Sequence, residues 1–301
     1  MNNLIAWELT GVPYTSMKEP GGIADAIAVL RACGLAGELG AAGVHDAGDL
    51  RLSEPSGERG PSGVLNEESL LRLVGTTRDR VVRTHGAGTR PLLVGGDCPV
   101  LLGAVAAIRD RGAAPGLIML DGHEDAWPPH LSETGEGSDS EIAIALGRVP
   151  DLPDPIAQML PLIQPSALAF LGPRDRDEIA SAGVESLRGR AAFFADDLEI
   201  SATLESGGDP ASDAIQAIDA HEFWLHIDLD VLATDAFGAV DYPQPGGIDW
   251  GELDQLAATA VGAEGCRGVS VVIYNPDLDP DRTAASKLVG FLSRLIERRS
   301  W

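Results

Sequence analysis

The chain has 301 residues, 44% of them hydrophobic and 23% charged, which is ordinary for a globular enzyme. Its formal net charge of −24 argues against nucleic acid or an anionic membrane surface as a partner. Three scattered cysteines without a CxxC pair are typical of reduced thiols. Neither a signal peptide nor a membrane-spanning stretch is recognisable. These features predict a cytoplasmic protein, and the negative charge is compatible with a cationic small-molecule substrate.

In the first half of the chain, short apolar runs alternate with stretches of helical periodicity. Strands are expected at 4–9, 44–50, 91–94 and 117–120, and helices at 23–33, 66–85 and 101–108. Cys33 falls on the inner face of the first helix, which predicts a core residue. Residues 53–63 are rich in Gly, Pro and Ser and predict a loop.

The second half continues this alternation. Strands are expected at 167–171, 191–194, 223–232 and 268–274, and helices at 142–146, 215–220, 250–257 and 284–296. Residues 150–165 contain several prolines and predict a connector with a short helix. Strands that alternate with helices indicate an α/β fold with a doubly wound, mostly parallel sheet. We expect one domain over residues 1–301.

Polarity changes abruptly at the end of the apolar run Leu117–Leu120. Asp121, His123 and Asp125 stand two residues apart there, so they share one face if the extended geometry persists. Carboxylates and an imidazole packed this closely need a cation among them. A solvated loop at the end of a strand is the alternative from this segment alone.

A second apolar run, from residue 223, ends in the same way with Asp228 and Asp230. The carboxyl ends of parallel strands meet at one edge of a sheet, where the active sites of α/β enzymes lie. Two strand ends that carry four carboxylates and a histidine are difficult to explain as surface. A binuclear metal site is therefore favoured.

Cys98 follows a third buried strand, in the turn Gly95-Gly96-Asp97-Cys98. The glycines do not form a nucleotide-binding motif, because neither GxGxxG nor GxxxxGK[ST] is present. A thiol between a strand and a helix lies near the positive helix N-terminus, which favours the thiolate that binds metal. A buried, inert cysteine is the alternative.

These turns, in this order, resemble those of the arginase/agmatinase/formiminoglutamase family, the ureohydrolases. Residues 95–98 resemble its GGDH turn, 121–125 its DAHxD motif and 228–230 its DxD motif. Pro245-Gly246-Gly247 and Asn275-Pro276 fall where the family carries its PGG loop and its E-x-N-P strand end. The resemblance spans nearly the whole chain, and it implies a three-layer α/β/α fold and a homo-oligomer.

By position, the resemblance implies two divalent metal ions, with manganese first. One ion would be held by Cys98, Asp121, Asp125 and Asp228, and the other by Asp121, His123, Asp228 and Asp230. Such a pair lowers the pKa of a water, so that hydroxide can attack a planar guanidino or formimino carbon. Asp230 would orient the hydroxide and protonate the departing amine.

Three positions depart from the family pattern. Cys98 replaces a histidine, and its softer sulfur favours zinc, iron or cobalt over manganese. Ile273 stands where the family has the glutamate that binds a guanidinium. Glu136 lies near a position where arginases have a proton-relaying histidine. Glu136 or Asp139 is therefore expected to supply the anion that Ile273 lacks, although acids in this loop also suit a helix N-terminus.

The leading hypothesis is a binuclear metal hydrolase that cleaves a C–N bond in a guanidino or amidino compound. A second hypothesis keeps the metal site and changes the substrate to a neutral amide or imine, which Ile273 favours. The third is a non-catalytic relative of the same family. Because every position expected to bind metal carries a donor side chain, the third is the least favoured.

Overall fold

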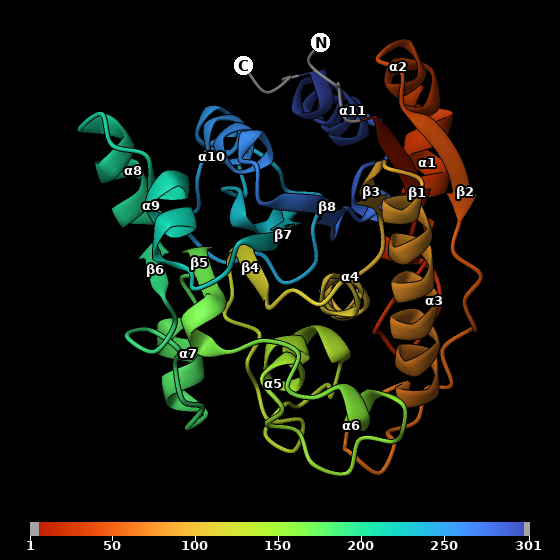
Figure 1. Ribbon diagram of the computed structural model, residues 1–301, viewed down its shortest axis with the longest axis vertical. Helices are drawn as coiled ribbons and strands as arrows, with labels where there is room; N and C mark the ends of the chain where they lie inside the picture. Colours follow the sequence, from red (N-terminus) through yellow and green to blue (C-terminus); the bar gives the residue numbers. More distant parts are fainter. Residues whose placement is uncertain (1–5, 298–301) are drawn as a thin grey trace.

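The computed structural model describes residues 6–297, in which eight parallel strands form one sheet (Figure 1). The strands are β1 (Trp7–Gly11), β2 (His45–Asp49), β3 (Arg90–Val94), β4 (Pro115–Leu120), β5 (Leu168–Gly172), β6 (Phe193–Asp196), β7 (Glu222–Asp228) and β8 (Cys266–Val272). Their order across the sheet is β2-β1-β3-β8-β7-β4-β5-β6. The predicted doubly wound parallel sheet is confirmed.

Helices cover both faces of this sheet. They are α1 (Ala26–Ala32), α2 (Leu35–Ala41), α3 (Glu67–Gly86), α4 (Val100–Asp110), α5 (Glu141–Ala145), α6 (Ile156–Met159), α7 (Arg176–Ser181), α8 (Asp197–Glu205), α9 (Pro210–Ala217), α10 (Trp250–Gly262) and α11 (Thr283–Glu297). In Figure 1, α3, α4 and α5 lie on one side of the sheet and α8 to α11 on the other. This is the expected three-layer α/β/α architecture.

The most buried elements lie at the centre of the sheet. All six residues of β4 are buried, as expected for a parallel strand covered on both faces. Helix α4 is buried along its length from Val100 to Ile108, because it packs between the sheet and its neighbour α3. Within residues 6–297, no helix combines the length and hydrophobicity that crossing a membrane requires.

Several predicted boundaries are wrong for physical reasons. The first strand is shifted from 4–9 to Trp7–Gly11, and residues 1–5 lie outside the described part. Helix α9 begins at Pro210, not 215, because the Asp209 side chain caps its first turn, and it ends before the extended Ile218. Strand β7 stops at Asp228, where a 3-10 turn replaces the expected extension to 232. Cys33 is only half-buried.

Candidate metal centre

The predicted donors lie at, or just after, the carboxyl ends of three strands in the middle of the sheet. Cys98 follows β3, the Asp121–Asp125 segment follows β4, and Asp228 and Asp230 lie at the end of β7. Strand β8 lies between β3 and β7. All four strands are parallel, so their carboxyl ends bring these side chains to one edge of the sheet.

The distances show that these side chains meet. The Cys98 Sγ lies 2.9 Å from Asp228 Oδ2, and His123 Nδ1 lies 2.8 Å from Asp230 Oδ2. His123 Nδ1 is also 3.8 Å from Asp121 Oδ1. Asp125 joins Cys98 on a further side of the cluster. The structure therefore brings together all six residues that the sequence predicts as metal ligands.

The alternation of side chains along a strand does not cause this convergence, so that part of the prediction is wrong. Strand β4 ends at Leu120, and Asp125 has a left-handed backbone with a φ of +45°. Tight turns take over, in which the Asp121 carboxylate accepts a hydrogen bond from the His123 amide (2.8 Å). The Asp228 carboxylate accepts one in the same way from the Asp230 amide (2.7 Å).

Gly172, at the end of β5, allows the two aspartate turns to approach each other. Its φ is +113°, and a Cβ there would lie 2.8 Å from the Asp121 carbonyl oxygen and 2.5 Å from Val231 Cγ2. Both distances are too short for any side chain. A glycine is therefore required for Asp121 and the Asp228–Val231 turn to lie side by side.

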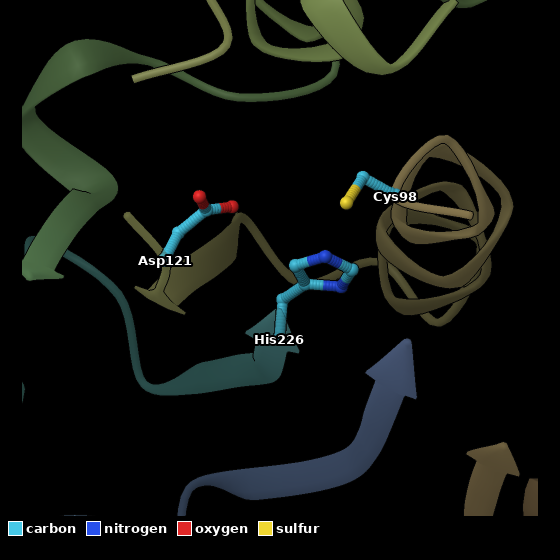
Figure 2. A group of neighbouring side chains, drawn as sticks. All are labelled: Cys98, Asp121 and His226. Atoms are coloured by element: carbon cyan, nitrogen blue, oxygen red, sulfur yellow. The ribbon is translucent and has the colours of Figure 1, made fainter. Parts of the chain in front are cut away.

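Two further donors lie in the cluster that the sequence analysis missed. His226, on β7, lies with Cys98 and Asp121 (Figure 2). Glu141, at the start of α5, lies with Cys98 and Asp125, and in each trio the ligand atoms are within 4.8 Å of one another. His226 stands two residues before Asp228, so the alternation along a strand places both on the same face. The sequence contains this signal, but it lies within an apolar run. Nothing local indicates that Glu141 is buried.

Several polar atoms in this cluster are buried without a hydrogen-bond partner among the described residues. They are Asp121 Oδ2, both carboxylate oxygens of Glu141 and His226 Nε2. Burying such atoms unpaired is costly unless a cation satisfies them. Carboxylate oxygens, imidazole nitrogens and a thiol sulfur are suitable ligands for divalent transition metals. The residues present therefore fit the divalent ions that the resemblance implies.

The carboxylates of the cluster repel one another when no cation lies among them. Burial and the neighbouring carboxylates raise the pKa of Asp121, Asp125, Asp228 and Glu141 well above their usual range. Burial opposes the charged form of Asp230 as well, but the adjacent His123 outweighs it and lowers the pKa of that carboxyl. A metal ion would relieve the repulsion among these carboxylates.

The nitrogen and sulfur donors respond differently to the same surroundings. Burial opposes protonation of His123, but Asp230 and Asp121 outweigh it and raise its pKa to about 10. Burial lowers the pKa of His226 to about 3, so that imidazole is neutral. Burial and the Asp228 carboxylate raise the pKa of Cys98 well above its usual value. Burial and Asp228 thus oppose the Cys98 thiolate that the helix N-terminus is expected to favour, and a bound cation would favour it again.

These shifts predict that the chelator-treated protein loses stability as the pH rises from about 6 to 8.5. The pKa of Glu136 is raised from its usual value to about 8, chiefly by burial. A carboxyl with a raised folded-state pKa destabilises the fold as the pH rises above its unfolded value. The stabilising His123 proton is lost in the same direction, above about 6.5. Thermal unfolding of the chelated protein across this range tests the sign, and a rising melting temperature would contradict it.

The cluster forms the floor of a pocket of about 720 Å³. Its wall includes Glu136, Asp139, Tyr242 and Ile273. Glu136 is 6% exposed and accepts a hydrogen bond from the Tyr242 hydroxyl (3.4 Å), whereas Asp139 accepts bonds from the hydroxyls of Ser132 and Thr134 within its own loop. Ile273 has a φ of +71°, which is rare and strained for a β-branched residue.

Comparison with known proteins agrees with this geometry. The model of the arginase family matches residues 9–293. The arginase of Brevibacillus brevis is 24% identical over 299 residues, 96% of each chain. Human Arginase-1 is 25% identical over 175 residues, which are 56% of this chain and only about half (54%) of that relative.

The same fold occurs in a solved structure of the arginase from Bacillus caldovelox. It superposes with a TM-score of 0.80 at 20% identity and covers 97% of this chain and 98% of the other. A family model that spans nearly the entire sequence, together with this fold, identifies the relationship. The chain belongs to the arginase family.

Proposed function

We propose that the protein is a binuclear metal-dependent hydrolase that cleaves a C–N bond of a guanidino or amidino compound. The observation that supports this most strongly is the convergence of six donor side chains, five of which line the floor of one pocket. The ligands would be Cys98, Asp121, His123, Asp125, Asp228 and Asp230. Two bound divalent ions would supply hydroxide at neutral pH by lowering the pKa of a water between them.

We assign the proton transfers of the reaction to Asp230. Its Oδ1 accepts a hydrogen bond from the Gly122 amide (2.9 Å), which fixes the orientation of the carboxylate. The side chain lines the pocket floor while its Oδ2 faces His123. In this position Asp230 can orient the attacking water, hold its proton and pass it to the departing amine. The carboxylate itself is returned unchanged.

Glu136 is the carboxylate we assign to a cationic substrate. Glu136 lines the pocket, and within residues 6–297 its one side-chain partner is the Tyr242 hydroxyl, at 3.4 Å and 3.5 Å from the two oxygens. Asp139, the other candidate of the sequence analysis, has an oxygen occupied by two hydroxyls of its own loop. Ile273 contributes only an apolar wall. A guanidinium in this pocket would therefore pair with Glu136.

A screen for urea release from arginine, agmatine, guanidinobutyrate and hydroxyarginine by the metal-loaded protein tests this assignment. Glu136→Gln is expected to cost about 2–4 kcal/mol of transition-state binding, because it removes one partner of a buried charge pair. Asp139→Asn is the matched control and should change kcat/KM much less. With the wild type, kcat/KM should rise with pH through about 8, where the raised pKa of Glu136 lies, and Glu136→Gln should abolish that rise. If no guanidino compound is turned over, the cationic substrate is excluded.

A neutral amide or imine is the second candidate, and Ile273 favours it. The apolar side chain replaces the family's guanidinium-binding glutamate. Burial raises the pKa of Glu136 to about 8, so its protonated carboxyl could donate a hydrogen bond to a neutral substrate at pH 7. Ile273→Glu is the converse test: it should create or increase urea release if this residue alone moved the substrate preference. An unchanged profile would show that position 273 does not set it.

A further inference from the structure

His226 has a place in the cluster that no motif assigns to it. Its ligand atom lies within 4.8 Å of those of Cys98 and Asp121, and the three side chains point toward one another (Figure 2). His226 and Asp121 are completely buried, and Cys98 is 1% exposed. A nitrogen, a sulfur and an oxygen donor thus share a small space inside the protein.

The two ring nitrogens of His226 have different surroundings. Nδ1 lies 2.7 Å from the hydroxyl oxygen of Ser270, whereas Nε2 is buried with no hydrogen-bond partner between residues 6 and 297. The same hydroxyl oxygen accepts a hydrogen bond from the Trp224 indole N–H (2.9 Å). A ligating histidine commonly uses one nitrogen for the metal while the other donates to a fixed acceptor. In the tautomer whose Nδ1–H donates to Ser270, the Nε2 lone pair is free to bind a cation.

The positions of Ser270 and Trp224 are built into the sheet. His226 and Ser270 are directly paired across β7 and β8. The indole of Trp224 lies over Gly268, where a Cβ would come within 2.3 Å of the ring. The glycine therefore makes room for the indole that orients the serine hydroxyl. This arrangement holds His226 in one orientation.

His226 also lies on the correct side of the cluster for a ligand. Cys98, Asp125 and Asp228 line the pocket, but His226 and Asp121 do not. His226 would approach an ion from the protein interior and leave its pocket side open for water and substrate. The charge of the cluster also favours a neutral ligand. The negative charges of a Cys98 thiolate and four aspartates already outnumber the positive charges of two divalent ions. A neutral imidazole adds a bond without adding negative charge.

We propose that His226 binds, through Nε2, the same ion as Cys98, and that this thiolate- and imidazole-bearing half of the site selects zinc, cobalt or ferrous iron over manganese. The inference rests on the proposed metal centre and adds to it a ligand outside the three motifs. Cys98 stands in the turn after β3, where the family has a histidine. The nitrogen donor missing there would then come from His226 on β7.

Cobalt substitution of the full-length protein tests this without measuring activity. A Cys98 thiolate on cobalt gives a charge-transfer absorption band, which Cys98→Ser should abolish. His226→Asn keeps a polar group in reach of Ser270 and removes Nε2 together with the outer part of the ring. It should change the band and weaken zinc binding at this half by more than the roughly 100-fold that loss of an outer-shell partner costs. His85→Asn, which removes a histidine remote from the cluster, should leave both unchanged.

Proton NMR of the cobalt-loaded wild type tests the role of His226 without a variant, so the result does not depend on whether His226→Asn folds. Two strongly shifted imidazole N–H resonances are expected, one from His226 and one from His123, whose Nδ1 faces the carboxylates. A thiolate band with one such resonance, or a zinc affinity unaltered in folded His226→Asn, would overturn the role of His226 alone. A wild type that binds no divalent metal would overturn the proposed centre as well.

Discussion

Asp228→Asn is expected to lose most of both metal ions and, with them, hydrolysis. Asp228 is 3% exposed, and its Oδ2 lies 2.9 Å from Cys98 Sγ while its Oδ1 is tied to the Asp230 amide. The proposed centre makes this carboxylate the bridge between the two ions. Asparagine retains the acceptor for the Asp230 amide but removes the negative charge, so binding should fail without collapse of the turn. Isothermal titration with zinc and manganese measures the affinity for each ion.

Asp110→Asn is the matched control for this experiment, because Asp110 pairs with Arg78 at the surface, far from the cluster in the fold. Circular dichroism before titration establishes that both variants are folded. If Asp228→Asn binds both ions with the affinity of the wild type, Asp228 does not bridge. The ligand set that the motifs imply would then be wrong for Asp228, the residue proposed to bind both ions.

Arg174→Ala is expected to lower the free energy of unfolding by about 3 kcal/mol, since the guanidinium donates to several backbone carbonyls at once. Its Nη2 lies 2.6 Å from the carbonyl of Asp230 and 3.4 Å from that of Gln244, and its Nη1 lies 3.4 Å from that of Val231. One side chain thus joins the second aspartate turn to the loop that carries Gln244. Urea denaturation monitored by tryptophan fluorescence provides the measurement.

Two substitutions separate the geometry of Arg174 from its charge. Arg174→Lys keeps the positive charge beside Asp230 but cannot reach carbonyls in two directions, so it should recover only part of the loss. Arg176→Ala removes an exposed arginine two residues away and should change the unfolding free energy by less than about 0.5 kcal/mol. Equal effects of Arg174→Ala and Arg176→Ala would show that the network around Arg174 contributes nothing.

The sequence predicts the parts of the site in which physical signals are local. A buried parallel strand has a continuous apolar run, and the sudden change to Asp121 or Asp228 marks its carboxyl end. Parallel strands then bring such ends to one edge of the sheet. The grouping of Asp121, His123 and Asp228 can therefore be predicted from the sequence alone. The start of α9 is an equally local signal, because Asp209 caps the first turn and Pro210 occupies its first position.

Other parts depend on tertiary packing that no local pattern reveals. The left-handed conformations of Asp125 and Ile273 arise from turns that the surrounding structure imposes. Glu141 has the sequence context of an exposed acid at a helix start, yet α5 packs against α4 and buries it completely. His226 reads as one residue of an apolar strand until Cys98 and Asp121 are seen beside it. The cytoplasmic location and the homo-oligomer stay predictions.

The metal content of the purified wild-type protein tests the central claim most directly. After expression in metal-replete medium and removal of loosely bound ions, mass-spectrometric counting should find about two divalent ions per chain, because the six-donor cluster offers ligands for a pair. Zinc, cobalt or iron should account for at least one of them if the thiolate-bearing half selects softer metals. A protein that retains no divalent ion under these conditions would contradict the account.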